Sequence, residues 1–201
     1  MERKSQHRVI RCMAMLEQRI QQQFFESADL HSQAAEALSR PVAQAAQALA
    51  ACLTAGGKLL AAGSDVGAAL APVICAAFTG RFERERPPLA AFALRAEGVG
   101  GALAQQVRAL GQPGDVLLVI DTAAPADALL EAADAAHERE MTVLVLTGAD
   151  ALAWGARLAE TDVLMAVPHE RAARVAETQL LVLHGLCDAV DLQLMGEQEC
   201  A

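Results

Sequence analysis

The chain has 201 residues, of which 54% are hydrophobic and 20% charged, while aromatic residues make up only 3%. This length suits one domain with a core of small aliphatic side chains, and the composition is too apolar for a disordered chain. The 16 Lys and Arg against 25 Asp and Glu give a formal net charge of -9, which disfavours direct binding to DNA or RNA.

Cysteine spacing and the N-terminal composition indicate the compartment. The five cysteines lie far apart and form no CxxC motif, so they predict neither a disulfide framework nor a zinc site. Residues 1–23 are charged and polar, and no apolar stretch is long enough to span a bilayer. We therefore expect a cytoplasmic protein that has no metal or other cofactor and does not contact a membrane.

Two helices are predicted before the first strand. Apolar residues recur every three or four positions over residues 8–38, which is the pattern of a helix with one buried face. Pro41 is expected to end this helix, and a second helix would run over residues 42–54 and stop at the glycine pair that follows. We therefore treat residues 1–56 as a helical oligomerisation segment and residues 57–201 as the main domain.

Five apolar runs separated by Ala-rich, helix-like sequence come next. The runs are continuous instead of alternating with polar residues, as in strands that are covered on both faces. This order predicts an α/β fold, a three-layer sandwich in which helices flank a five-stranded parallel sheet. The predicted strands are 58–62, 89–94, 116–120, 142–146 and 163–167, and a last helix is expected over residues 170–195.

Ligands of open parallel sheets bind beyond the carboxyl ends of the strands, where helix N-termini attract anions. The candidate ligand-binding residues after the first and third predicted strands are Gly63, Ser64, Asp65, Gly67, Asp121 and Thr122. The first group forms the sequence GSDVG, which matches neither a dinucleotide-binding nor a Walker motif. A plain strand-to-helix turn capped by Ser64 or Asp65 is an equally good interpretation.

Five motifs are spread over nearly the whole chain. They are GGKLLAAGSDVGAA at 56–69, GRFERERPPLAAFAL at 80–94, QVRALGQPGDVLLVIDT at 106–122, MTVLVLTG at 141–148 and ARVAETQLLVLHGLCDAVD at 173–191. Together they resemble the sugar isomerase (SIS) domain family, in the branch that holds the bacterial phosphoheptose isomerases and the non-catalytic DnaA initiator-associating protein. The resemblance implies the α/β fold described above and a homotetramer.

The phosphate-binding residues that the resemblance implies are changed in this chain. Gly67 replaces the serine of the family's first turn, and Asp121 and Ala126 replace two serines of its second loop, while Thr122 is retained. A carboxylate at Asp121 that faced the site would repel a phosphate by about 1 kcal/mol even when well solvated at ~4 Å. We therefore expect weak binding of sugar phosphates.

The acid–base residues implied by the resemblance are also replaced. Val73 and Ala77 stand where the isomerases carry a His and a Glu, and Ala176 stands in place of a Gln. Of the family's catalytic positions only His184 remains, and a single histidine is more often a packed or interface residue than a catalyst. We therefore expect a protein without isomerase activity.

The carboxylates of Asp65 and Asp121, which stand where the family resemblance implies other residues, can also be interpreted as helix caps. Asp65 and Asp121 each precede a predicted helix N-terminus, so they would satisfy free helix amides and fill the phosphate pocket, or would point into solvent. The sequence favours neither alternative. Trp154 stands alone in an Ala-rich segment and is expected in the core or in an interface.

The expected function is that of a tetrameric scaffold. It would resemble the DnaA initiator-associating protein and bind several copies of DnaA during the initiation of DNA replication. Leu194 and Met195, close to an acidic tail, are candidates for partner contact, with core packing as the alternative for each. Alternative functions are a phosphoheptose isomerase that acts on sedoheptulose 7-phosphate and a sensor that binds a phosphosugar.

Overall fold

The computed structural model of the chain describes residues 2–95 and 101–196, with side chains of the first helix from residue 13 onward. The helices are α1 (Glu2–Thr54), α2 (Val66–Thr79), α3 (Ala102–Leu110), α4 (Asp127–Glu138), α5 (Leu152–Gly155) and α6 (Ala172–Met195). The strands are β1 (Leu59–Gly63), β2 (Ala91–Ala93), β3 (Val116–Ile120), β4 (Thr142–Thr147) and β5 (Val163–Ala166).

The strands form one parallel sheet in the order β2-β1-β3-β4-β5. Every residue of β1 and β3 is buried, as expected for strands that are covered on both faces. The predicted α/β fold with a five-stranded parallel sheet is confirmed, and the strand bounds differ from the prediction by one or two residues.

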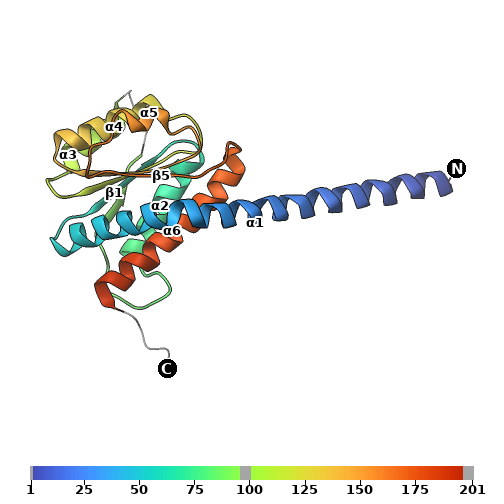
Figure 1. Cartoon of the computed structure of the whole chain (residues 1–201), viewed down its shortest axis with the longest axis horizontal. Coiled ribbons are helices and arrows are strands. Elements are labelled where there is room, and N and C mark those ends of the chain that lie inside the picture. Colours follow the sequence, from blue (N-terminus) through green and yellow to red (C-terminus); the bar gives the residue numbers. More distant parts are fainter. Residues whose placement is uncertain (1, 96–100, 197–201) are drawn as a thin grey trace.

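Helices cover both faces of the sheet, so the domain has three layers (Figure 1). On one face, α1, α2 and α6 share a core with Leu118 and Ile120 of β3. On the other face, α3, α4 and α5 pack against Leu117 and Val119 of the same strand. Alternate residues of a strand point to opposite faces, which explains why this run is apolar throughout.

The connectivity of the sheet indicates where a ligand would bind. β1 is followed in the chain by β2 on one side of it, and β3 then lies on its other side. In open α/β sheets, ligands bind at the carboxyl end of such a switch point. The segments that follow β1 and β3 therefore form the candidate site.

The N-terminal region forms one helix instead of two. α1 runs from Glu2 to Thr54 with Pro41 inside it, so the prediction of a helix break at this proline is wrong. Leu38 before the proline and Ala45 and Leu49 after it are all buried in the core that α1 shares with α6. Burial along one continuous helix face outweighs the ~3 kcal/mol that an interior proline costs a helix.

The N-terminal half of α1 projects from the domain (Figure 1). Its apolar stripe is exposed, with exposed fractions of 57% for Ile20 and 71% for Phe24. Among the described side chains of this half, the other large apolar residues that are exposed are Met13, Met15, Leu16 and Phe25. In the described part of the chain, no helix combines the length and the apolar character that crossing a membrane requires.

We expect replacement of Pro41 by Ala to stabilise the protein, because it restores an N–H group in the middle of α1 and removes the clash of the proline ring. P41A should raise the free energy of unfolding in urea by about 1–3 kcal/mol. The matched control is P168A in an exposed segment outside the helices, which should change it by less than about 1 kcal/mol. Unchanged or lower stability of P41A would show that packing requires the proline.

Candidate functional site

The turn between β1 and α2 is pressed against the end of β3. The amide of Ser64 donates a hydrogen bond to the carbonyl oxygen of Ile120 over 3.1 Å. A Cβ atom on Gly67 would lie 2.2 Å from the same oxygen, and one on Gly63 would lie 2.2 Å from the carbonyl carbon of Gly67. Both positions need glycine because backbones approach here too closely for a side chain. The missing hydroxyl at Gly67 thus has a structural cause.

Asp65 is the N-cap residue of α2 but its side chain does not cap the helix. Its φ of 48° and ψ of −119° lie outside the left-handed helical region, in a conformation that residues with a side chain rarely adopt, and its carboxylate makes no hydrogen bond to the helix amides. The residue is exposed. For Asp65, the interpretation that the carboxylate fills a phosphate pocket is wrong, and the alternative that it points into solvent holds.

Asp121, directly after β3, is fully buried. One carboxylate oxygen accepts a hydrogen bond from the Thr147 hydroxyl at 2.5 Å, and the other accepts one from Trp154 Nε1 at 3.0 Å. Burial raises the pKa of this carboxyl, and the charge of Asp150 raises it further, while the two hydrogen bonds act in the opposite direction. Asp121 therefore neither caps a helix nor points into solvent, and both sequence-based alternatives are wrong for it.

Gln179 on α6 secures the same strand ends. Its side chain is fully buried, and Nε2 donates hydrogen bonds to the backbone carbonyl oxygens of Asp121 and, over 3.2 Å, of Leu146. Its Oε1 atom is buried and has no hydrogen-bond partner among the described residues. Residues of β3, β4, α5 and α6 thus meet in one polar cluster, which consists of Asp121, Thr147, Trp154 and Gln179.

Sequence reasoning missed most of this polar cluster. The position of Thr147 directly after the predicted strand 142–146 places it at the edge of the sheet where ligands bind, but no local signal predicts its hydrogen bond to Asp121. No local signal marks Gln179 within its helix. The prediction that Trp154 lies in the core or in an interface is consistent with its complete burial, but its hydrogen bond to Asp121 depends on how α5 packs.

Thr122 begins the segment that leads from β3 to α4. It is 5% exposed, and its carbonyl oxygen would lie 3.0 Å from a Cβ atom on Gly148. The segment ends at Ala126, the N-cap residue of α4, which offers no side-chain cap. The carbonyl oxygen of Ala126 accepts hydrogen bonds from the amides of Leu129 and Leu130, but its side chain offers no acceptor to the amides of the first turn. Asp127 is the acidic residue of that turn.

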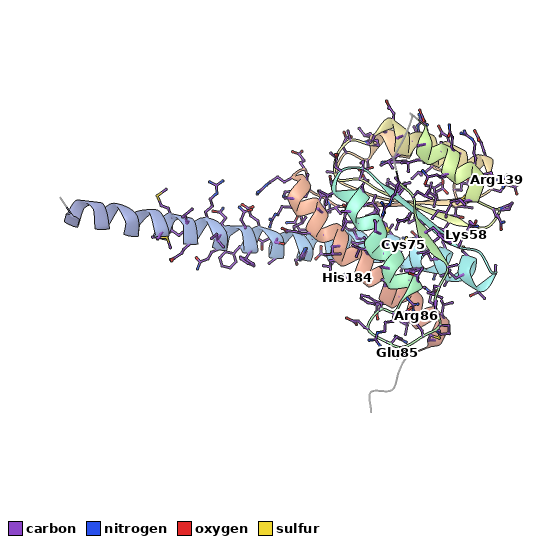
Figure 2. The ribbon with its side chains drawn as sticks, turned by 180° about the vertical axis from the view of Figure 1, so that it is seen from behind. Lys58, Cys75, Glu85, Arg86, Arg139 and His184 are labelled. Carbon is purple, nitrogen blue, oxygen red and sulfur yellow. The ribbon has the colours of Figure 1, made fainter. Side chains whose placement is uncertain are left out.

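The candidate ligand-binding residues that follow β1 and β3 lie at one edge of the sheet. His184, the retained catalytic position, lies on α6 away from that edge. It follows Gln179 by five residues on α6, which is about 7.5 Å along the helix and on another side of it. The exposed ring of His184 packs against Phe82, with ring centroids 5.5 Å apart. Figure 2 shows His184 on α6. The side chain of Val73 on α2 is 43% exposed and carries no group that could transfer a proton.

Leu194 and Met195, the two candidates for partner contact, differ in how deeply they are buried. Leu194 is half-buried and packs against the core that α1, α2 and α6 share. Met195, the last residue of α6, is 45% exposed. Core packing therefore accounts for Leu194 but not for Met195.

A metal ion resident in a single copy of the chain would need several ligand side chains close together. The described part of the chain contains no group of three or more His, Cys, Asp or Glu side chains that could hold one. Val73 and Ala77, at the positions where the resemblance implies a His and a Glu, offer no ligand atoms.

Comparison with known proteins defines the family. The SIS domain model matches residues 23–148. A phosphoheptose isomerase of Methylibium petroleiphilum is 53% identical, covering 93% of this chain and 99% of its own, and one of Azoarcus sp. is 44% identical, covering 90% and 98%. The solved phosphoheptose isomerase of Neisseria gonorrhoeae has a TM-score of 0.81 at 39% identity, covering 88% of this chain and 98% of its own. The chain belongs to the SIS domain family, which confirms the resemblance.

The same relatives contradict the expected function. All three bear the name of an enzyme, the phosphoheptose isomerase. The expectation of a non-catalytic scaffold that binds DnaA in replication initiation is therefore wrong, and nothing in these relatives supports DnaA as a partner. The expectation rested on the replaced acid–base and phosphate-binding side chains, whereas the identity over the whole chain favours the enzyme. It also assumed that Asp121 faces the ligand, but this side chain is buried.

We expect Gly67→Ser to destabilise the protein, although serine is the residue that the family resemblance implies at this position. Its Cβ would collide with the backbone of Ile120, and the shift that relieves the collision should lower the free energy of unfolding by about 1–3 kcal/mol. Gly155→Ser is the matched control, because a Cβ there meets nothing within 4 Å. Equal thermal denaturation midpoints for the two variants would contradict the close approach.

Proposed function

We propose that the protein is a phosphoheptose isomerase, which converts sedoheptulose 7-phosphate, a ketose phosphate, to the corresponding aldose phosphate. The observation that carries this proposal is the 53% identity to the Methylibium petroleiphilum enzyme over 99% of that protein. The reaction moves a proton between adjacent carbons of the sugar. It therefore needs a site for the phosphate and groups that accept and donate the proton.

The edge of the sheet beyond β1 and β3 supports binding of the phosphate. Helix N-termini attract anions, and the N-cap residue Ala126 offers no side-chain acceptor to the first turn of α4, although its carbonyl oxygen already accepts from the amide of Leu129. Thr122, four residues before this N-cap, is the hydroxyl residue that the family resemblance retains in the loop. The strongest sequence argument against phosphate binding was a carboxylate at Asp121, and that side chain is buried and turned toward Thr147 and Trp154.

Proton transfer is assigned to His184, because an imidazole can both accept and donate a proton. Neither Val73 nor Ala77 can take this role. In its own chain, His184 is on another side of α6 from Gln179 and thus from the strand ends. A second copy of the chain must therefore bring a histidine to the phosphate site, so the proposal requires self-association.

The exposed stripe of α1 supports this self-association. Ile20, Phe24 and Phe25 lie on a helix that projects from the domain, and each is more than half exposed. Apolar stripes of this kind are normally covered by another helix. We propose a homotetramer that is held together by the projecting half of α1.

The purified protein should convert sedoheptulose 7-phosphate to an aldose phosphate, measured by chromatography of the sugar phosphates over time. Thr122→Ala should raise KM by about tenfold or more, because a hydrogen bond to a charged group contributes roughly 1.5–3 kcal/mol. Thr161→Ala, which removes an exposed threonine before β5, is the matched control and should leave KM unchanged. Binding of the sugar phosphate without any turnover would refute the proposed isomerase.

The double variant Ile20→Glu, Phe24→Glu should dissociate the homotetramer, because it places carboxylates in the stripe that we propose to be covered. Sedimentation velocity should show a tetramer for the unaltered protein and a smaller species for the variant. Gln21→Glu adds charge at an exposed polar position of the same helix and should leave the tetramer intact. A monomeric unaltered protein, or a tetrameric double variant, would contradict the proposed assembly.

A further inference from the structure

The segment between α2 and β2 lies along the C-terminal half of α6. Every second side chain of residues 81–86 is half-buried, and these side chains belong to Phe82, Arg84 and Arg86. The ring of Phe82 packs against that of His184 on α6. Arg84 Nη1 donates a hydrogen bond to the carbonyl oxygen of Gly196, the C-cap residue of α6, over 3.0 Å. We call residues 81–86 the strap.

Arg86 anchors the strap between two helices. Its side chain is fully buried, and Nε donates a hydrogen bond to Asp191 Oδ1 on α6 over 2.6 Å. The same guanidinium donates to the carbonyl oxygens of Ala77 and Phe78 near the end of α2, over 2.7 and 2.8 Å. Figure 2 shows Arg86 beside α6. Because the loss of one partner of a buried ion pair is costly, this end of the strap is fixed.

Phe82 is fixed as well, and it limits the orientation of His184. Its side chain packs against the core that α1, α2 and α6 share. The centroids of the two rings are 5.5 Å apart and the ring planes are tilted by 32°, an arrangement within the range of favourable aromatic pairs. The His184 side chain is exposed, and within the described residues its ring makes this contact and no hydrogen bond.

We propose that Phe82 is a positioning residue for His184. The proposal rests on the proposed function, in which His184 transfers the proton. An exposed side chain samples several rotamers, and a general acid or base acts only when its nitrogen is within hydrogen-bond reach of the reacting group. Packing against a fixed ring selects among these rotamers before the substrate binds. Since the contact is made within one chain, each copy presents an oriented histidine to the site of its neighbour.

This role predicts a particular kinetic signature. Phe82 acts through His184, so its loss should slow the chemical step. The contacts of Gln179 with the strand ends at the phosphate side lie on another side of α6, so binding of the substrate should not change. A purely structural role of Phe82 would lower the stability of the protein and leave the turnover of each folded molecule as it was.

The first test measures turnover of sedoheptulose 7-phosphate by Phe82→Leu. Leucine keeps an apolar contact with the core but lacks the ring. F82L should lower kcat about tenfold or more, because misplaced catalytic groups cost up to about a hundredfold in rate, and KM should stay unchanged. Phe82→Tyr retains the ring and should retain kcat. Loss of kcat in F82Y equal to that in F82L would contradict positioning by the ring.

The matched control is Phe92→Leu, which removes an exposed ring from the other face of the sheet. Phe92 on β2 is paired with Leu60, and Leu60 belongs to the core on the side of α3 and α4. Directly paired residues of neighbouring strands point to the same face, so Phe92 lies on the face opposite to α6. F92L should keep kcat and KM. Equal kcat in F82L and F92L, or a raised KM with unchanged kcat in F82L, would overturn the inference.

A second measurement needs no turnover. In deuterated protein with 13C-labelled histidine, the ring resonances of His184, identified by their loss in His184→Gln, should be displaced by the ring current of Phe82. F82L should move them toward the positions of an exposed histidine, and F92L should leave them in place. Unchanged resonances in F82L would overturn the inference.

The two proposals fail separately. Absence of turnover in the unaltered protein would refute the proposed function, while the spectra would still decide whether Phe82 orients His184. Turnover with equal kcat in F82L and the unaltered protein would refute only the role of Phe82.

Discussion

The hydrogen bonding of one buried carboxyl group holds the candidate site together. The Asp121 carboxylate accepts hydrogen bonds from Thr147 of β4 and Trp154 of α5. Its backbone carbonyl oxygen accepts one from Gln179 of α6. An unpaired carboxyl in this position would cost several kcal/mol, because it has been removed from water. These hydrogen bonds connect the ends of β3 and β4 to α5 and α6, so the positions of the four elements depend on one another. The segment that carries Thr122 begins directly after Asp121.

The opposite side of the site is fixed by the close approach of backbones. Gly63 and Gly67 bring the β1–α2 turn into contact with Ile120, so the switch point of the sheet is closed by main-chain atoms. A ligand at this edge must then lie outside the glycine turn, against the segment from β3 to α4. A turn that holds a ligand in one member of a fold can thus serve as packing in another.

The long first helix adds a separate constraint. In its second half, Leu38 and Leu49 are buried in the core that α1 shares with α6. In its first half, Phe24 and the neighbouring apolar side chains are exposed. Within the part of the chain that the structure describes, nothing covers this stripe. The proposed reaction and the proposed assembly are linked by the same geometry, because His184 is on another side of α6 from the strand ends.

The sequence by itself determined the sheet, because continuous apolar runs separated by helix-like sequence are typical of parallel strands that helices cover on both faces. It also placed Ser64, Asp65, Asp121 and Thr122 at the carboxyl edge of the sheet, where such folds bind ligands. It could not determine where the Asp121 side chain points, since the donors on Thr147 and Trp154 are 26 and 33 residues away in the chain. It also could not show that α1 continues through Pro41, because local propensity favours a break and only burial against α6 reverses that preference. Tertiary structure decided both, because burial and pairing energies depend on contacts between distant segments and these exceed the local terms that a sequence displays.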